Sequence, residues 1–394
     1  MSTPTRDRRW SSEPDAAERE ELVAIRRDLH RHPEILYEVH RTAGVVAERL
    51  RGLGLEPTGG VGKTGVTAML DSGAPGRCVI LRADMDALPI HEENETAYRS
   101  TVDGAMHACG HDCHVSIGLT TAKALLRTGG VTRGAVKLVF QPAEEGGNGA
   151  LAMVEDGVLE TPNVDAAFGL HVWNHLPVGK VAVVDGPFMG AVDQFRIRVR
   201  GRGGHGAIPQ ETRDPVVAAA AVVTALQQIA SRRVDPLDSV VVTVGRISGG
   251  EAFNVIPPHV DLEGTTRCFT DGVWEDLPGW VETIAQRTAE AHGCEADVEI
   301  RRLMRATVND AAMAALVREV AAEVVGSENV VEMRTLGSED FSEFLHRVPG
   351  CYFFVGSRNE AKGFVHSHHS PRFDVDEDVL PIGVEMLAGV ARRF

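Results

Sequence analysis

The chain has 394 residues, of which 43% are hydrophobic and 24% are charged, and its formal net charge at pH 7 is -16. This length exceeds the ~250 to 300 residues at which a single hydrophobic core stops growing, so we expect two domains. The negative charge repels nucleic acid and anionic lipid, and it argues against either of them as a partner.

The N-terminus and the cysteines indicate where the protein works. The first residues are polar throughout, and no apolar run approaches the ~18 residues that a membrane-spanning helix needs. Six cysteines scattered over a chain of this length do not suit a disulfide framework, so we expect reduced thiols. These observations predict a cytoplasmic protein that begins with a disordered tail over residues 1–15.

Alternating helices and strands make up the first half of the chain. A helical pattern begins at Asp15 and ends at His32, because the residue before a proline is pushed out of the helical region. Further helices are expected around residues 45–53 and 114–130. Four short apolar runs are typical of buried strands: "VTAML", "CVILRAD", "AVKLVFQP" and "AAFGLHV". The alternation predicts an α/β fold with a mixed, mostly parallel sheet flanked by helices.

The pattern changes near Pro187. Residues 193–202 alternate between apolar and charged, like a half-exposed strand, and residues 214–232 are typical of a long amphipathic helix. Two more strands and a second helix, over residues 280–293, come after them. We therefore expect an inserted α+β sandwich over residues 188–302. The flanking segments, 16–187 and 303–394, would form the first domain.

Chemically reactive side chains follow several of the predicted strands. Asp84 and Asp86 come just past one strand. Glu144 and Glu145 follow a second, and His171 follows a third. Because the ligand crevice of an open α/β sheet lies outside the carboxyl ends of the strands, we expect these groups to meet. Taken singly, a pair of glutamates is often a solvated helix start, and Asp84 could cap a helix.

Cys109 and His111 add a thiolate and an imidazole at the start of a predicted helix. Glu145 and His171 could reach the same point from neighbouring strand ends, and His369 in "SHHSPRFD" offers a fifth donor. Thiolate, imidazole and carboxylate together suit zinc or a similar transition metal. Five donors are more than one tetrahedral catalytic ion needs, which suggests two ions that share them.

The adjacent glutamates indicate a mechanism. If Glu145 binds metal, Glu144 beside it could take a proton from a water molecule and later return it to a leaving nitrogen. This division of roles is that of metal-assisted amide hydrolysis.

Seven motifs occur in an order that resembles one protein family. They are "MHACGHD", "QPAEEGGNGA", "GLHVWNHLPVG", "GRGGHGAIP", "FNVIPPHVDLEGTTR", "GSEDFSEF" and "HSPRFD". The chain is similar to the amidohydrolase branch of the M20 metallopeptidases, which includes hippurate hydrolases, plant indole-acetyl-amino-acid hydrolases and N-acyl-amino-acid aminoacylases. The similarity runs from Arg26 almost to the C-terminus.

The resemblance implies a binuclear metal domain interrupted by a smaller domain that mediates dimerisation and closes over the substrate. By match to the motifs, Glu144 is the general base and Asp86 orients a ligand. Asp84 occupies the position where peptidase branches carry a metal-binding histidine, so the first metal site should be built differently here. The ligands that the resemblance implies are Cys109, His111, Glu145, His171 and His369.

Three residues of the inserted domain also match the family. The resemblance implies that His205, in "GRGGHGAIP", crosses a dimer interface to stabilise the oxyanion. Asn254 and Arg267 match positions that bind the substrate carboxylate, which suits a guanidinium because it can donate two parallel hydrogen bonds. Without the resemblance, His205 would be interpreted as a turn residue and Arg267 as a charge on a strand surface.

We therefore predict a two-metal hydrolase that cleaves the amide bond of an N-acyl amino acid to give a carboxylic acid and a free amino acid. The alternatives are a metallo-dipeptidase on the same scaffold, a cysteine hydrolase with Cys109 as nucleophile, and a non-catalytic binding protein. Zinc and manganese are the expected ions, with nickel and cobalt open. We expect a homodimer, with a tetramer as the alternative, and no nucleic-acid or membrane partner. The sequence does not identify the acyl group.

Overall fold

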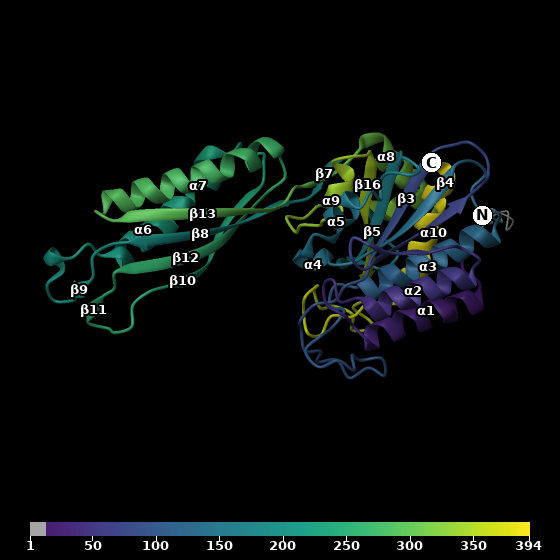
Figure 1. The fold of residues 1–394 in the computed structure, drawn as a ribbon, viewed down its shortest axis with the longest axis horizontal. Helices are drawn as coiled ribbons and strands as arrows, with labels where there is room; N and C mark the ends of the chain where they lie inside the picture. Colours follow the sequence, from purple (N-terminus) through teal and green to yellow (C-terminus); the bar gives the residue numbers. More distant parts are fainter. Residues whose placement is uncertain (1–12) are drawn as a thin grey trace. The chain divides into compact units, whose positions relative to one another are not determined.

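The structure, a computed structural model, describes residues 13–394, and these form two compact units. The first unit holds the described residues up to Gly186 and two later segments, Val308–Met333 and Asp340–Phe394. The second unit holds Pro187–Thr307 and Arg334–Glu339 (Figure 1). Most of the predicted tail lies outside the described residues.

The unit boundaries differ in detail from the predicted domain boundaries. We predicted a return to the first domain at residue 303, but strand β13 (Glu295–Met304) runs past that point and the second unit continues to Thr307. Residues 334–339 also belong to the second unit, where the N–H of Gly190 donates to the carbonyl of Gly337 at 2.7 Å. The hydrophobic pattern does not indicate that residues 334–339 rejoin the second unit, because individual backbone hydrogen bonds of this kind hold the segment there.

In the described part of the chain, an eight-stranded mixed sheet forms the centre of the first unit. Its strands, in sheet order, are β1 (Thr58–Val61), β2 (Gly65–Asp71), β4 (Ala135–Gln141), β3 (Cys78–Asp84), β5 (Ala166–Pro177), β16 (Gly350–Arg358), β6 (Val181–Ala182) and β15 (Val330–Val331). The central strands β4, β3, β5 and β16 pair in parallel. Every residue of β3 and β4 is buried, so both faces of the sheet are covered there. The predicted α/β class is confirmed.

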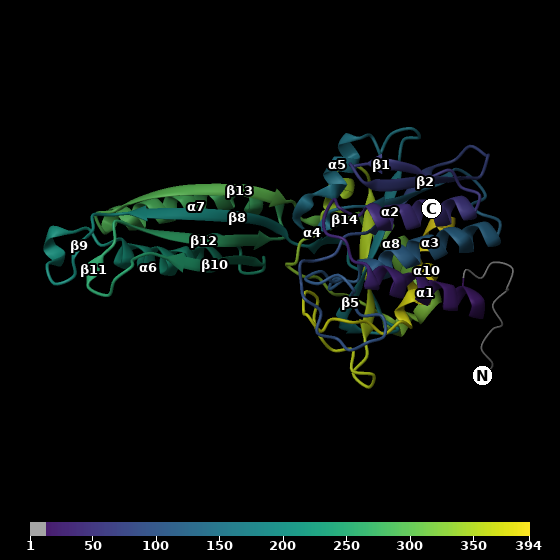
Figure 2. The same cartoon turned by 60° about the horizontal axis from the view of Figure 1, so that its bottom comes forward.

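The helices of this unit pack against the sheet, as the contacts of α3 with β3 and β4 and of α8 and α10 with β16 show. The longer ones are α1 (Ala16–Arg31), α2 (His40–Gly52), α3 (His111–Arg127), α8 (Ala311–Val325) and α10 (Val379–Arg393), and the shorter ones are α4 (Glu144–Gly147), α5 (Gly149–Glu155) and α9 (Ser342–Leu345). α1 begins as predicted, with Asp15 and Glu18 in a capping box. α3 contacts α1, α2 and α10, and the four helices lie together in Figure 2.

The second unit is an antiparallel sheet covered by helices on one face. The sheet order is β10 (Val240–Ser248), β12 (His259–Cys268), β8 (Ala191–Arg200) and β13. Helices α6 (Pro215–Leu226) and α7 (Asp271–Ala291) contact each other and both central strands. β8 alternates between buried and exposed residues along most of its length, as expected for one covered face. The strands β9 (Gly204–His205) and β11 (Val255–Ile256) form a separate pair. This is the predicted α+β architecture.

Three elements of the second unit differ from the prediction. The helix predicted over residues 214–232 ends as an α-helix at Leu226 and is followed by a π-helical turn, Ile229–Arg233. α7 begins nine residues before the predicted start at Trp280, although Pro278 lies inside it. β13 was not predicted, because charged residues alternate with its half-buried ones.

Short elements join these parts. β7 (Gly186–Met189) and β14 (Thr307–Asn309) lie where the chain passes from one unit to the other, and η2 (Pro209–Glu211) and η4 (Ser327–Asn329) are 3₁₀ turns. Among the helices of residues 13–394, we find none with the length and apolar character required to cross a bilayer.

Candidate metal centre

A left-handed glycine turns the chain between Cys109 and His111. Gly110 is the N-cap of α3 and has a φ of 87°, a conformation that residues with a Cβ rarely adopt. A Cβ at this position would also overlap Cγ2 of the buried Val172. The turn brings the thiol of Cys109 and the imidazole of His111 within 4.8 Å of each other at the N-terminus of α3.

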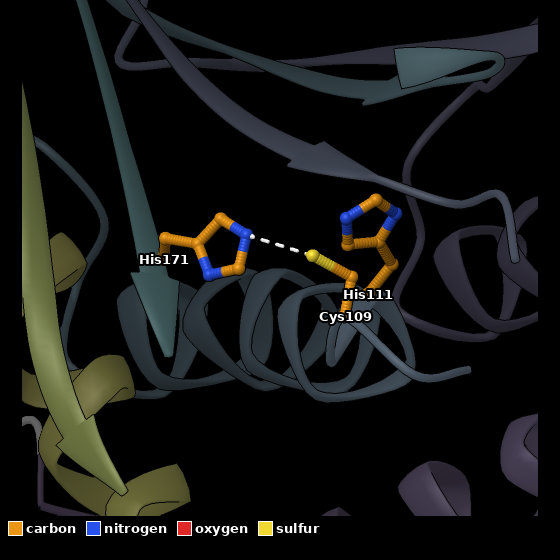
Figure 3. A group of neighbouring side chains, drawn as sticks. All are labelled: Cys109, His111 and His171. Carbon is orange, nitrogen blue, oxygen red and sulfur yellow. Dashed lines mark hydrogen bonds between the residues drawn. The ribbon is translucent and has the colours of Figure 1, made fainter. Parts of the chain in front are cut away.

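Cys109, His111 and His171 form one group of donors (Figure 3). The Sγ of Cys109 lies 3.4 Å from the Nε2 of His171. The Nδ1 of His171 lies 2.7 Å from the carbonyl oxygen of Val172 and donates to it, which leaves the lone pair on Nε2 directed toward the thiol. Burial and the neighbouring His114 hold the pKa of His171 well below its usual value, so the ring stays neutral, as a metal ligand must be.

Glu145 and His369 form a second group with Cys109. Oε1 of Glu145 lies 3.4 Å from Nε2 of His369 and 3.9 Å from Nε2 of His111. The backbone is left-handed at His369, with a φ of 63°, and at Ala143, with a φ of 53°. Such conformations cost energy in residues other than glycine and persist only where the surroundings hold them.

Taken together, the five predicted ligands lie in two overlapping groups that share Cys109.

Asp86 fixes the backbone of both glutamates. Its two carboxylate oxygens accept the N–H groups of Glu144 and Glu145 at 2.9 and 3.1 Å. One of these oxygens also lies 3.5 Å from Nδ1 of His111. Glu144, His111 and Glu145 offer donor atoms within 4.8 Å of one another, so the carboxylate of Glu144 borders the ligand groups. Asp86 therefore lies beside His111, and the ligand-orienting role that the resemblance implies for it stays a prediction.

The donor set fits a divalent cation. Both ring nitrogens of His111 and Oε1 of Glu145 are buried and make no hydrogen bond within residues 13–394, and buried polar atoms without partners are costly. Burial opposes the charge of His111, yet Asp84, Asp86 and Glu145 raise its pKa to about 10, which reflects an excess of negative charge. Thiolate, imidazole and carboxylate donors around such a site suit zinc and similar ions.

Asp84, which the resemblance matches to a histidine of the peptidase branches, belongs to another network. It ends β3 rather than capping a helix, and it accepts from Nη1 of Arg82 at 2.6 Å. Its other oxygen lies 2.5 Å from Nδ1 of His114, while Nε2 of His114 accepts the N–H of Val172 at 3.0 Å. Both nitrogens of His114 are therefore occupied. Although Asp84, His111 and His114 lie close together, His114 has no lone pair left for a metal ion.

The predicted residues of the second unit fall at two ends of its sheet. His205 and Asn254 are neighbours, since β9 pairs with β11 and the N–H of Gly206 donates to the carbonyl of Asn254 at 2.8 Å. Nδ1 of His205 accepts the N–H of Ala207 at 3.0 Å, so its exposed Nε2 carries the proton as a donor.

Arg267 lies at the opposite end of β12. It pairs with Val192, whereas His259, at the start of the strand, pairs with Arg200. At ~3.3 Å per residue along a strand, His259 and Arg267 are roughly 25 Å apart. Nη1 of Arg267 donates to Oγ of Ser338 at 3.0 Å. One copy of the second unit therefore does not bring Asn254 and Arg267 together.

Sequence reasoning missed two fully buried arginines near the site. Arg26 shares the buried face of α1 with Leu22 and Leu29, and Arg82 lies inside the buried strand β3. A charged residue at a core position of a helix or a central strand is a signal in itself, because it has to be paired when buried. Both positions could have been selected by that rule.

Comparison with known proteins gives consistent matches over nearly the whole chain. A family model described as peptidase family M20/M25/M40 matches residues 80–393. The IAA-amino acid hydrolase ILR1-like 4 of Arabidopsis thaliana is 44% identical over 379 residues, which are 95% of this chain and 85% of that protein. The N-acetyl-L-cysteine deacetylase of Bacillus subtilis is 37% identical over 374 residues, which are 95% of this chain and 88% of that protein.

A solved structure agrees with these matches. The Bacillus subtilis YXEP protein, described as a dinuclear metal binding peptidase from the M20 family, superposes with a TM-score of 0.83 at 32% identity. The match covers 96% of this chain and 99% of that one.

Proposed function

The chain belongs to peptidase family M20/M25/M40, and from this premise we propose that it is a two-metal amidohydrolase that releases an amino acid from an N-acyl amino acid. The observation that carries the proposal is the meeting of the five donors around Cys109, with the Glu144 carboxylate beside them. The name of one relative states a substrate, N-acetyl-L-cysteine, that is itself an N-acyl amino acid. The cytoplasmic location stays a prediction.

The roles of the residues follow from their positions. Cys109, His111, Glu145, His171 and His369 would hold two divalent cations, of which zinc and manganese suit the donors best. When bound, the cations would lower the pKa of a water molecule and polarise the substrate carbonyl. Glu144 would accept a proton from that water and return it to the leaving nitrogen. Asp86 would fix the backbone of both glutamates and orient the ring of His111.

His205, Asn254 and Arg267 support the proposal of a homodimer. Nε2 of His205 is an exposed donor, as stabilisation of an oxyanion requires. A substrate carboxylate on Arg267 would be out of reach of His205 and Asn254 in the same unit, since β12 separates them. A second copy of the chain would supply its own His205 and Asn254 to the substrate that Arg267 of the first copy binds.

The test separates the two neighbouring glutamates. Glu144→Gln keeps the size of the side chain but cannot accept a proton, so we expect amino-acid release to fall at least about 100-fold with both metals still bound. Glu145→Gln is the matched comparison and should lose metal. Release is measured by mass spectrometry over a panel of N-acyl amino acids and dipeptides, and metal content by elemental analysis.

Each outcome of this test has a distinct meaning. Turnover near the wild-type rate by metal-replete Glu144→Gln would refute the assignment of the base. Release from dipeptides alone would favour a metallo-dipeptidase. No release from any compound by the metal-replete wild type would favour a binding protein.

The chemistry of Cys109 argues against a cysteine hydrolase. Burial and the carboxylates of Glu145 and Glu144 raise the pKa of the thiol well above its usual value, whereas a nucleophilic cysteine needs a lowered pKa. The nearby His171 is held neutral and cannot stabilise a thiolate as an imidazolium. A cysteine hydrolase would also be indifferent to chelators, whereas the proposed enzyme should lose activity with a chelator and regain it with added metal.

A further inference from the structure

We propose that Arg26 is a positioning residue of the metal centre, which joins the first turn of α3, where His111 lies, to the loop that carries His369. Its side chain has no exposed surface and lies on α1, outside the groups of candidate ligands. Nε of Arg26 donates to Oδ2 of Asp112 at 2.8 Å, and Nη2 donates to Oδ1 of Asp374 at 2.6 Å. We call these three residues the Arg26 clamp.

The two carboxylates of the Arg26 clamp belong to the ligand-bearing segments. Asp112 directly follows His111 in the first turn of α3, and Asp374 follows His369 by five residues. The same segments also meet through the backbone, because the N–H of His369 donates to the carbonyl of Ala108 at 2.9 Å. Arg26 therefore ties together two parts of the chain that are far apart in sequence and adjacent at the site.

Further hydrogen bonds fix the Arg26 clamp from both sides. Oη of Tyr98 donates to the second oxygen of Asp374 at 2.7 Å. His30, one turn after Arg26 on α1, lies with Nδ1 2.8 Å from Oδ2 of Asp112. Because a guanidinium presents its donors in a rigid fork, it fixes the directions of both carboxylates as well as their charges.

The His369 loop needs such support. A left-handed backbone at a residue other than glycine is unfavourable unless its surroundings hold it. His369 is also the most exposed of the five candidate ligands, with 56% of its side chain accessible, so packing against its own ring cannot supply that support. Residues that orient ligands from behind typically change metal affinity 10- to 100-fold when they are replaced.

This inference rests on the ligand set of the proposed function, and its test uses the full-length chain and cobalt(II) as the probe. Arg26→Lys keeps the charge but removes the fork, and Asp374→Asn removes one carboxylate. We expect each to raise the dissociation constant of at least one cobalt ion, about tenfold for Arg26→Lys, and to change the visible absorption of the bound cobalt. Equilibrium dialysis gives the affinities, and circular dichroism gives the folded fraction.

Two matched controls come from the same elements. Arg19→Lys alters another arginine of α1, whose guanidinium pairs with the exposed Glu13 and contacts no member of the Arg26 clamp. Asp376→Asn removes a carboxylate two residues beyond Asp374, whose partners are Asn359 and Lys362. Both should bind cobalt within twofold of the wild type and with the same spectrum.

The outcomes separate this inference from the proposed function. If the wild type binds two cobalt ions and both clamp variants match it in affinity and spectrum, Arg26 is only structural and the inference is wrong. If Arg26→Lys does not fold, Asp374→Asn alone decides in the same way. If the wild type binds no cobalt, the ligand set of the proposed function fails and the inference fails with it.

Discussion

Gly110 is the residue on which the geometry of the ligand turn depends most directly. An alanine here would have to adopt a φ of 87° and would overlap Val172. The left-handed conformation costs ~1 to 2 kcal/mol and overpacking a further ~1 to 3 kcal/mol. We therefore expect Gly110→Ala to lower the free energy of unfolding of the first unit by roughly 2 to 5 kcal/mol, measured by urea denaturation.

Gly129 is the control for Gly110. Its φ is 88°, nearly the same, but a Cβ there would meet no atom within 4 Å. Gly129→Ala should therefore cost only the conformational part, about 1 to 2 kcal/mol. Equal losses in the two variants would show that Val172 yields without cost and that the close approach does not matter.

His30 makes the stability of the metal-free chain depend on pH. Burial lowers the pKa of this histidine, but the carboxylate of Asp112 and hydrogen bonds to Asp112 and Glu92 outweigh burial and raise the pKa to about 9. A raised pKa of this kind stabilises the fold below the unfolded-state pKa of about 6.5, and this stabilisation is lost as the pH rises through 9.

The prediction concerns the difference between the wild type and His30→Gln. With a chelator present, the advantage of the wild type in unfolding free energy should be about 3 kcal/mol larger at pH 6 than at pH 9.5. Urea denaturation at both pH values measures it. His32→Gln, a change at the half-exposed C-cap of the same helix, is the control. An advantage that does not change with pH would mean that His30 is uncharged in the folded chain.

Four of the five candidate ligands could be located from the sequence because they lie at the end of a recognisable strand or at the start of a helix. His369 lies in a loop between β16 and α10 and was singled out only by the histidines of "SHHSPRFD". Thiol, imidazole and carboxylate groups stand out at such positions whatever the packing around them. Arg26 and Asp112 could not be assigned a role in this way, since their meaning lies in a pairing between residues 86 positions apart. Long-range ion pairs have no periodic pattern in sequence.

Among the elements, α7 contains a proline that lies outside the helix predicted over residues 280–293. A proline inside a helix removes the N–H that would bond the carbonyl four residues earlier, which for Pro278 is the carbonyl of Trp274. In the structure, the carbonyl of Trp274 accepts instead from Nη1 of Arg302 on β13, at 2.5 Å. The same guanidinium contacts the Trp274 ring and donates to Asp193 at 3.1 Å. A neighbouring strand thus supplies the donor that the helix lacks.

A double-mutant cycle tests whether Arg302 replaces the hydrogen-bond donor that Pro278 lacks. Arg302→Leu should destabilise the second unit by about 1 to 3 kcal/mol, because it leaves the Trp274 carbonyl and Asp193 with fewer partners. Pro278→Ala restores an N–H to the helix. In that background Arg302→Leu should cost about 1 kcal/mol less, as measured by urea denaturation. Additive costs would show that Arg302 does not stand in for the missing N–H.

The strands of the second unit illustrate the same limit. β8 was predicted because its apolar residues alternate clearly with arginines. β13 has the same period, with half-buried Ala296, Val298 and Ile300, but acidic residues between them suggest an exposed segment when they are considered alone. Pairing with β8 along its whole length decides the structure of β13, and such pairing is invisible in a single segment.

At the scale of the whole molecule, the two edges of the second sheet differ in charge. β13 carries Glu295, Asp297 and Glu299, which protect an edge from pairing with another chain. The opposite edge, β10, begins with five uncharged residues, Val240 to Val244. Val241 on this strand and Val217 on α6 are 36% and 55% exposed. If the chain forms the homodimer that we propose, we expect its contact at this uncharged edge.

The prediction adds charge at that edge. Val217→Glu combined with Val241→Glu should raise the dissociation constant of the dimer at least tenfold, because a buried carboxylate without a partner is costly. Sedimentation equilibrium measures it. Thr283→Glu places a charge on an exposed position of α7 and should leave the dimer intact. If the double variant dimerises as tightly as the wild type, the contact lies elsewhere.

The overall architecture was more accessible to prediction than its boundaries. Apolar strands that alternate with helices specify a covered sheet, and the change of pattern near Pro187 marks the insertion. The return of residues 334–339 to the second unit depends on a few backbone contacts, such as that between Gly190 and Gly337, which no composition or periodicity signals.

Arg267 lies on β12 and His205 on the separate β9–β11 pair, and the distance between them in one chain has a kinetic consequence. If both act on one substrate, an isolated chain lacks half of its own catalytic equipment. The rate per chain would then fall on dilution below the dimer dissociation constant, and at such dilution the total rate would grow as the square of the protein concentration. In that concentration range, doubling the amount of protein in the cell would raise the total rate of hydrolysis about fourfold.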